Sequence, residues 1–260
     1  MGWGAGMRLR NISKGIVMAK KHLVFSVVIP AAILAACLFP LSLGPQLPPP
    51  RTALLAPGES IGNLDTLKSQ LKQYHECTCT CGCYAKDLDL QADRAIDFLR
   101  ARAGRRAPTE KLALVLDIDE TTLSNYEEME KADFAYDSKA FAAWIDTAKA
   151  PAIPGTLRIY QEAQKLGVRV FFLTGRIETQ RAATEQNLRS RGFQNWQELI
   201  LRSRWDAFKT AQEYKSKARG AIAAQGYKLV LNVGDQWSDL KGDPQAEFSV
   251  KYPDPFYFIP

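Results

Sequence analysis

Short apolar runs alternate with longer amphipathic segments along the second half of the chain. Runs that are almost entirely apolar are typical of strands buried on both faces of a parallel sheet. Segments with apolar residues at helical spacing, several of them ending near a glycine, predict helices between these strands. The predicted strands cover residues 112–116, 168–173, 199–201 and 228–233, and the predicted helices cover residues 156–166, 178–189 and 215–224. This alternation predicts an α/β fold, a Rossmann-like three-layer sandwich with a mostly parallel sheet.

The residues before the first predicted strand follow a different pattern. Leucines, alanines and charged residues recur at helical spacing in residues 64–74 and 87–102. These segments predict two helices joined by a cysteine-rich turn. We therefore expect residues 64–106 to form a small helical addition and residues 107–260 to form the core. Within the core, the aromatic and charged residues of segment 127–148 predict a partly buried helical region.

The beginning of the chain has the composition of a targeting segment. A basic leader at residues 1–22 precedes an apolar segment at residues 23–43, and a proline-rich linker follows at residues 44–63. A basic flank before an apolar run is typical of a secretory signal or an amino-terminal membrane anchor. The apolar segment approaches the ~20 residues needed to span a bilayer. We expect an exported, membrane-associated protein on the periplasmic or extracellular side.

Three forms of attachment remain open for this apolar segment. The sequence around Cys37 resembles a bacterial lipoprotein signal, in which the cysteine carries the lipid, although the residues after it are apolar. An uncleaved membrane anchor and a simply cleaved signal are the alternatives. Met7 and Met18 are alternative starts of the protein.

The net charge of +6 comes from the amino-terminal segment alone. Up to residue 58 the chain holds six basic residues and no acidic residue, and the remainder balances 28 basic against 28 acidic residues. A neutral folded part gives no electrostatic support for a nucleic-acid partner. We therefore expect no nucleic-acid binding.

Four of the five cysteines alternate with other residues at Cys77, Cys79, Cys81 and Cys83. This spacing differs from the ligand spacing of zinc sites, which usually separates a pair by two or more residues. In an exported protein, a disulfide from Cys77 or Cys79 to Cys83 is one interpretation. Metal binding and a turn without chemical role are the others.

Two carboxylates follow the first predicted strand. Asp117 and Asp119 stand at its carboxyl end, where open α/β sheets place their ligand sites. In an extended chain residues i and i+2 point to the same side, so both carboxylates reach one small volume. Two anions there repel each other unless a cation or a shared proton intervenes. We therefore expect a hard divalent metal, Mg²⁺ above all. The alternative is a helix start with Asp119 as N-cap and Glu120 in the first turn.

Polar residues also follow two later predicted strands. Thr174 and Gly175 come after residues 168–173, and Asp235 with Asp239 comes after residues 228–233. If these strands are neighbours, their carboxyl ends meet, and the clustered carboxylates would hold a metal ion. A hydroxyl with backbone amides would bind an anion there. The cation for such an anion would be Lys215 at a helix start, with Lys209 and Lys217 as alternatives.

Together these residues resemble the four ordered motifs of the haloacid-dehalogenase (HAD) superfamily. The motifs are Asp117-Ile-Asp-Glu-Thr, Thr174-Gly-Arg, Tyr214-Lys-Ser and Gly234-Asp-Gln-Trp-Ser-Asp. More narrowly, they resemble subfamily IIIB, the bacterial acid phosphatases that include outer-membrane lipoproteins and are related to plant vegetative storage proteins. The resemblance extends over residues 64–260, including the closing segment 252–260.

The resemblance implies a role for each motif residue. It makes Asp117 the nucleophile that forms an aspartyl-phosphate, and Asp119 the acid and base for the leaving alcohol and the attacking water. Phosphate would be bound by Thr174, Gly175 and Lys215.

The resemblance also implies a metal site. Mg²⁺ would be held by Asp117, by the backbone carbonyl of Asp119 and by Asp235, with Asp239 orienting its water ligands. Arg176 is interpreted as a structural ion-pair partner.

The sequence thus predicts a Mg²⁺-dependent acid phosphatase that acts on a small phosphorylated metabolite, with nucleotides and aromatic phosphomonoesters as candidates. An inactive storage or binding protein of the same fold, and a phosphotransferase, are the alternatives. Aromatic residues would either line the substrate entrance or serve as packing. These are Tyr126, Phe134, Tyr136 and Trp144.

Overall fold

The computed structural model describes residues 62–77, 83–206 and 209–260, which belong to one compact unit. The predicted basic leader, the apolar segment and all but the end of the proline-rich linker lie outside the described residues, as do Cys37, Cys79 and Cys81. Among the helices that are described, none is long and apolar enough to cross a membrane.

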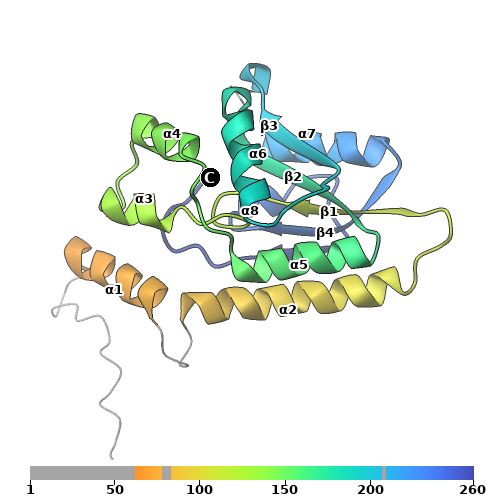
Figure 1. Ribbon diagram of the computed structural model, residues 1–260, viewed down its shortest axis with the longest axis horizontal. Helices are drawn as coiled ribbons and strands as arrows, with labels where there is room; N and C mark the ends of the chain where they lie inside the picture. The colour runs from red at the N-terminus through yellow and green to blue at the C-terminus, as the bar shows by residue number, and fades with distance from the viewer. Residues whose placement is uncertain (1–61, 78–82, 207–208) are drawn as a thin grey trace, which may run out of the picture. The chain divides into compact units, whose positions relative to one another are not determined.

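A parallel sheet forms the centre of the molecule (Figure 1). Its strands run in the order β3-β2-β1-β4-β5, and every neighbouring pair is parallel. The strands are β1 (Lys111–Leu116), β2 (Arg169–Ile177), β3 (Glu198–Arg202), β4 (Tyr227–Gly234) and β5 (Phe248–Lys251). The first four were predicted from their apolar runs. β5 was missed because it is short and only one of its four residues is buried.

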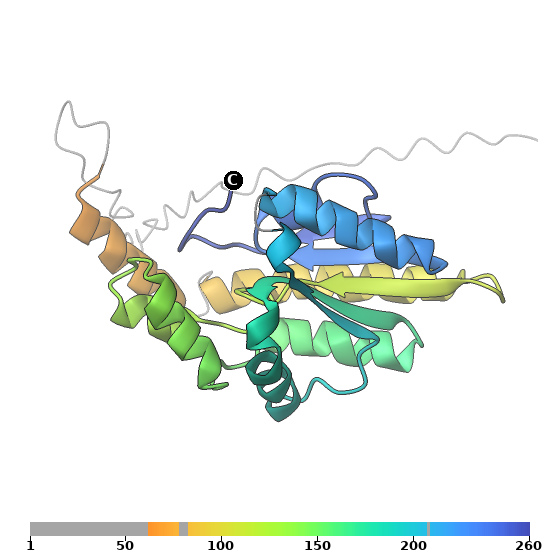
Figure 2. The same cartoon turned by 90° about the horizontal axis from the view of Figure 1, so that it is seen from above.

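Helices cover both faces of this sheet, which confirms the predicted three-layer α/β fold (Figure 2). On one face α2 (Tyr84–Ala103), α5 (Pro154–Lys165) and α6 (Arg181–Ser190) pack over a large apolar core. On the other face α7 (Ala211–Ala224) packs over a smaller one. The remaining helical elements are α1 (Leu64–Glu76), α3 (Tyr126–Lys131), α4 (Ser138–Asp146), α8 (Trp237–Leu240) and the 3₁₀ turns η1 (Glu178–Gln180) and η2 (Arg204–Asp206).

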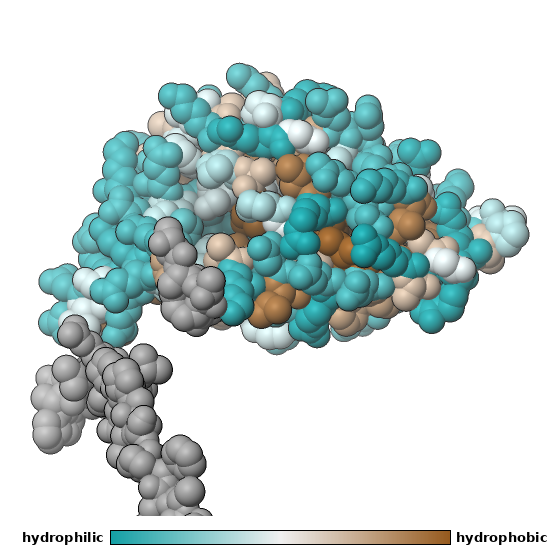
Figure 3. Space-filling view, turned by 60° about the horizontal axis from the view of Figure 1, so that its bottom comes forward, coloured by the Kyte–Doolittle hydropathy of each residue, from teal (hydrophilic) through white to brown (hydrophobic). Residues whose placement is uncertain are grey.

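The helix α2 is an integral layer of the sandwich. It packs along α5 and over β4 and β5, the part of this face that α5 and α6 leave uncovered. Most of its buried side chains are apolar and spaced along one helical face: Leu88, Ala92, Ala95, Ile96 and Leu99. Tyr84 at its start and Arg102 near its end are also buried. The outer surface of this layer is mostly hydrophilic, with separate apolar patches (Figure 3).

The helix α1, in contrast, has no buried residue. It lies against α3 and the turn that follows it through two ion pairs, Lys72 with Glu130 and Lys68 with Asp133, each 2.5 Å long. A disulfide between Cys77 and Cys83, whose Cα atoms are 5.8 Å apart, links the end of α1 to the beginning of α2. This pairing is one of the two that the alternating cysteines allowed.

The segment 127–148 forms two helices, so the single predicted helical region is only partly correct. The backbone between α3 and α4 takes the left-handed conformation at Asp133 (φ 52°) and Phe134 (φ 59°), which ends the first helix. Asp137 then caps the second helix by accepting hydrogen bonds from the amides of Lys139 and Ala140.

Two further boundaries differ from their predicted positions. The helix α7 begins at Ala211, where Thr210 and Glu213 form a capping box, so Lys215 lies in the second turn instead of at the helix start. Strand β2 continues through Thr174 and Gly175 to Ile177, with a shift of register after Leu173. The prediction relied on large apolar residues, and neither Thr174 and Gly175 nor the first turn of α7 (residues 211–213) contains one.

We predict that Gly155→Ala destabilises the fold by about 1–3 kcal/mol, because overpacking forces packed elements apart. A Cβ atom added at Gly155 in α5 would lie 2.8 Å from the Cβ of Ala92 in α2. The matched control is Gly220→Ala in α7, whose added Cβ would lie 3.6 Å from Pro244. That control gains about 0.4–1 kcal/mol from helix propensity. Urea unfolding measures both, and equal stabilities for the two variants would contradict the close packing of α2 on α5.

Candidate active site

The carboxyl end of β1 leads into a tight loop. The amide of Asp117 donates to the carbonyl of Val233 in β4 (3.0 Å), and the carbonyl of Ile118 accepts the amides of Thr122 and Leu123 (2.8 Å each). Glu120 takes the left-handed conformation, with φ of 54°. The next helix, α3, starts only at Tyr126, so the alternative of a helix capped by Asp119 is wrong.

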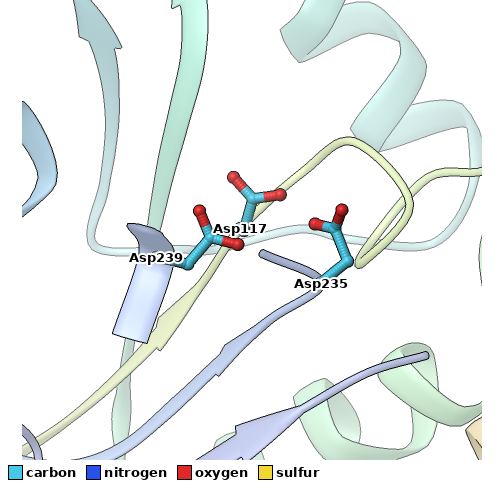
Figure 4. A group of neighbouring side chains, drawn as sticks. All are labelled: Asp117, Asp235 and Asp239. Carbon is cyan, nitrogen blue, oxygen red and sulfur yellow. The ribbon is translucent and has the colours of Figure 1, made fainter. Parts of the chain in front are cut away.

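Three aspartates gather where β1 and β4 end (Figure 4). Asp117 follows β1, Asp235 follows β4, and Asp239 stands on the short helix α8. A carboxylate oxygen of each lies within 4.8 Å of those of the other two, and all three residues are buried. The predicted meeting of these strand ends is present because β1 and β4 are neighbours in the sheet.

Lys215 reaches this cluster from α7. Its ammonium donates to Asp117 Oδ1 at 2.5 Å and also to Asp239 Oδ1. Burial lowers the pKa of the ammonium, but the two carboxylates outweigh that effect and raise it above its usual value. The alternatives Lys209 and Lys217 contact Asp206 instead, so among the three candidate lysines it is Lys215 that reaches the aspartates.

The cluster has fewer positive than negative groups. Asp235 accepts hydrogen bonds from the Thr121 hydroxyl (3.0 Å) and from the Gln236 amide (2.8 Å), both neutral donors. Burial and neighbouring carboxylates raise the pKa of Asp117 and of Asp235 well above their usual range. A bound cation would relieve the repulsion between these carboxylates. Their oxygen atoms are the donors that a hard divalent ion prefers. The buried aspartates therefore fit a metal ion.

Asp119 points to a different set of partners. Its carboxylate forms an ion pair with Arg176, 2.7 Å from Nη2, as expected for a structural partner. Its Oδ1 also accepts from Asn125 Nδ2 (2.9 Å). Burial raises the pKa of Asp119, but the Arg176 guanidinium and these hydrogen bonds bring it below its usual value. Two carboxylates one residue apart thus have opposite pKa shifts.

Thr174 and Gly175 lie beside Asp119. The Thr174 side chain is buried, accepts a hydrogen bond from the Arg176 amide (3.1 Å), and approaches Asp119 Oδ2 at 3.5 Å. Gly175 is exposed, and a Cβ atom added there would meet no atom within 4 Å. Strand β2 continues beyond both residues.

Several residues around the aspartates were missed in the sequence. Asn125 bonds to both Asp119 and Glu120, and Gln236 connects Asp235 to the end of the chain through Asp254 (2.6 Å) and the amide of Ile259 (3.1 Å). Neither the apolar pattern nor the spacing of charges points to buried amides. For Gln236, its position directly after Asp235 was the one feature of the sequence that indicated a place near the aspartates.

Two of the aromatic residues that were candidates for a substrate entrance, Tyr126 and Phe134, lie in one aromatic cluster with Phe256. Tyr126 stacks on His75, with ring centroids 3.4 Å apart, and Phe134 stacks on Phe256 of the carboxyl-terminal segment. Trp144 is buried and donates to Asn125 Oδ1 (2.9 Å), whereas Tyr136 is 79% exposed. Packing accounts for the positions of Tyr126 and Phe134.

Comparisons with known proteins agree with this geometry. The family model for HAD superfamily, subfamily IIIB (acid phosphatase) matches residues 52–260. Acid phosphatase 1 of Solanum lycopersicum is 39% identical over 179 residues, which are 68% of this chain and 69% of that protein. Vegetative storage protein 1 of Arabidopsis thaliana is 31% identical over 150 residues, 56% of this chain and 55% of that protein.

A solved structure shares the fold. The class C acid phosphatase from Bacillus anthracis with tungstate bound has a TM-score of 0.61 at 23% identity, over 75% of this chain and 86% of that one. The family match covers all of the described residues, including the aspartates of Figure 4. The chain therefore belongs to subfamily IIIB of the HAD superfamily, the acid phosphatases, and is an enzyme of the phosphomonoesterase class.

Proposed function

We propose that this protein is a Mg²⁺-dependent acid phosphatase that hydrolyses small phosphomonoesters through an aspartyl-phosphate on Asp117. The observation that carries the proposal is the contact of Asp117 with Lys215 inside a buried cluster of carboxylates at the carboxyl edge of the sheet. A nucleophilic carboxylate needs a positive neighbour that also attracts a dianionic phosphoryl group. The family match supports the same reaction class.

In the first step an Oδ atom of Asp117 attacks phosphorus and forms a new O–P bond. The ester P–O bond breaks, and its electron pair goes to the leaving oxygen, which takes a proton from the carboxyl of Asp119. In the second step the Asp119 carboxylate removes a proton from water, whose oxygen bonds to phosphorus. The aspartyl O–P bond then breaks, its electron pair returns to Asp117, and inorganic phosphate leaves.

The proposed metal site consists of Asp117, the backbone carbonyl of Asp119, and Asp235. Mg²⁺ prefers oxygen ligands, and these residues supply oxygen atoms only. When bound, the ion would neutralise charge on the phosphoryl oxygens. Asp239 is proposed as the neighbour that orients its water ligands, and its carboxylate also holds Lys215 in place.

Thr174, Gly175 and Lys215 are the proposed phosphate-binding residues. The Thr174 hydroxyl and Asp119 lie close together, so a phosphoryl group bound to the threonine would have the proton donor beside its leaving oxygen. The open space at Gly175 leaves room for a phosphate oxygen to approach the backbone. The Lys215 ammonium would compensate the charge that develops in the transition state.

The proposed substrates are small phosphorylated metabolites, with nucleotides and aromatic phosphomonoesters as candidates. Plant relatives include a stem 31 kDa glycoprotein of Glycine max, 38% identical over 56% of this chain and 59% of that protein. A glycoprotein relative supports an exported protein, and the apolar segment 23–43 supports membrane association, either as lipoprotein or through an anchor.

Two alternatives follow from the relatives and the chemistry. The vegetative storage proteins among the relatives favour an inactive storage role. A phosphotransferase would share the aspartyl-phosphate but pass the phosphoryl group to an alcohol. The presence of Asp117 supports an active enzyme over a storage protein.

We predict that Asp117→Asn lowers kcat for 4-nitrophenyl phosphate by at least about 1,000-fold, because no other group replaces the covalent step. Chelation of the metal should abolish wild-type activity, and Mg²⁺ should restore it. The control is Asp206→Asn, which removes a carboxylate that contacts Ser203 and Lys209 outside the cluster and should keep full activity. Mg²⁺-loaded wild type no faster than Asp117→Asn would favour the storage role.

We predict that Lys215→Met destabilises the metal-free protein by about 3–5 kcal/mol, since it leaves buried carboxylates without their cation. Added Mg²⁺ should recover part of this loss by binding the same carboxylates. Lys217→Met is the control, because that lysine is 69% exposed, and its effect should stay below about 0.5 kcal/mol. Urea unfolding with and without Mg²⁺ measures the effect, and an equal loss under both conditions would argue against the proposed metal site.

If Cys37 carries a lipid, we predict that a radioactive fatty acid labels the wild-type protein in growing cells and does not label Cys37→Ser. The lipid would be attached through the cysteine sulfur, which serine lacks. Fractionation of the same cells measures membrane association separately. Equal labelling of both proteins would rule out lipid at Cys37 and leave the anchor or the cleaved signal.

A further inference from the structure

Asn125 occupies a helix-capping position without capping the helix. It is the N-cap residue of α3, where an asparagine side chain usually accepts a hydrogen bond from the first turn. Here the side chain makes no such bond and is fully buried. Its amide turns instead toward the catalytic loop, residues 117–123 after β1. The Asn125 side chain thus forms other contacts in place of the capping hydrogen bond.

These contacts use every polar atom of the Asn125 side chain. Nδ2 donates to Asp119 Oδ1 (2.9 Å) and to Glu120 Oε2 (3.0 Å). Oδ1 accepts from the indole Nε1 of Trp144 in α4 (2.9 Å). The indole N–H is a donor only, so the amide oxygen must face Trp144 and the amide nitrogen must face Asp119. Trp144 therefore fixes which way the amide of Asn125 points.

The same residue also holds the loop that carries Asp119. Glu120 Oε1 accepts the backbone amide of Asn125 at 2.5 Å. Glu120 is in the left-handed conformation, which L-residues other than glycine seldom adopt without support. Asn125 thus donates two hydrogen bonds to Glu120, the residue after Asp119, and holds it in this conformation.

The bonds leave the two oxygens of Asp119 in different environments. Oδ1 accepts Asn125 Nδ2 together with Arg176 Nη2 (2.7 Å) and Nε (3.1 Å). Oδ2 has only longer contacts, to Arg176 Nε (3.3 Å) and to the Thr174 hydroxyl (3.5 Å). Oδ1 is therefore held by the protein, and Oδ2 is the oxygen that remains to exchange a proton with substrate.

We propose that Asn125, oriented by Trp144, is a positioning residue that holds the carboxyl group of Asp119 with Oδ2 toward the leaving oxygen. This inference rests on the proposed function, in which Asp119 protonates the leaving alcohol. The geometry matters most when that alcohol is a poor leaving group, because its oxygen must then receive a proton as the bond breaks. A phenolate stabilised by nitro groups leaves without that proton.

The experiment compares an alkyl phosphomonoester with 2,4-dinitrophenyl phosphate as substrates of the full-length, Mg²⁺-loaded enzyme. Asn125→Ala should lower kcat/KM for the alkyl ester by about 10- to 100-fold, a part of what general acid catalysis contributes. Trp144→Phe keeps a packed ring and removes only the N–H donor, so its loss should be about 3- to 10-fold. Both variants should change kcat/KM for the dinitrophenyl ester by less than about 2-fold. Its leaving group departs without the proton, and the later hydrolysis of the aspartyl-phosphate does not enter kcat/KM.

Two controls separate positioning from general damage to the structure. Trp196→Phe removes an indole that packs against Phe172 and Arg189, away from the catalytic loop, and should leave both substrates unaffected. Asp119→Asn combined with Trp144→Phe should be no slower on the alkyl ester than Asp119→Asn alone, because residues that act through one group are not additive.

The outcomes distinguish this inference from the proposed function. Equal losses on both esters for Asn125→Ala and Trp144→Phe would overturn the positioning role, as would additive losses in the double variant. If Asp119→Asn itself lowered kcat/KM equally for both esters, the proposed role of Asp119 as proton donor would fail, and the inference with it. A loss confined to the alkyl ester, absent in the Asp119→Asn background, would establish it.

Discussion

Mutual repulsion of buried carboxylates is the constraint on which the rest of this structure depends. A parallel sheet brings the ends of β1 and β4 together, and each end delivers an aspartate into a volume from which water is largely excluded. Without compensating charge, such a cluster would oppose folding by several kcal/mol per ion. Lys215 supplies part of that charge from α7, the helix on the other face of the sheet from α2, α5 and α6. The helix α7 is therefore as much a part of the site as the strands.

The same constraint separates two carboxylates that are nearly adjacent in the chain. Asp117 is buried among other carboxylates, and burial together with their charge raises its pKa. Asp119 turns away toward Arg176 and Asn125, which favour its charged form. A difference in surroundings, and not in residue type, thus separates the two aspartates. The surroundings of Asp117 fit a metal ion, and those of Asp119 favour the charged form, which can accept a proton.

Most of the sheet and the main site residues could be predicted from the sequence because their signals are local. Apolar runs marked β1 to β4, and the polar residues after them marked the edge where Asp117 and Asp235 meet. The position of Lys215 within α7 was misjudged, since the first turn of that helix is polar and held by a capping box. Contacts such as Trp144 to Asn125 depend on how distant elements pack, and no spacing rule in the chain reports them.

The buried amide of Gln236 ties a metal-binding candidate to the far end of the chain. Its nitrogen contacts Asp235 and Asp254, and its oxygen accepts the amide of Ile259. The surroundings of Asp235 are thus incomplete until residues as far as Ile259 have been synthesised and folded back onto β4. A nascent chain still lacking those residues would carry all of the aspartates but not their final arrangement.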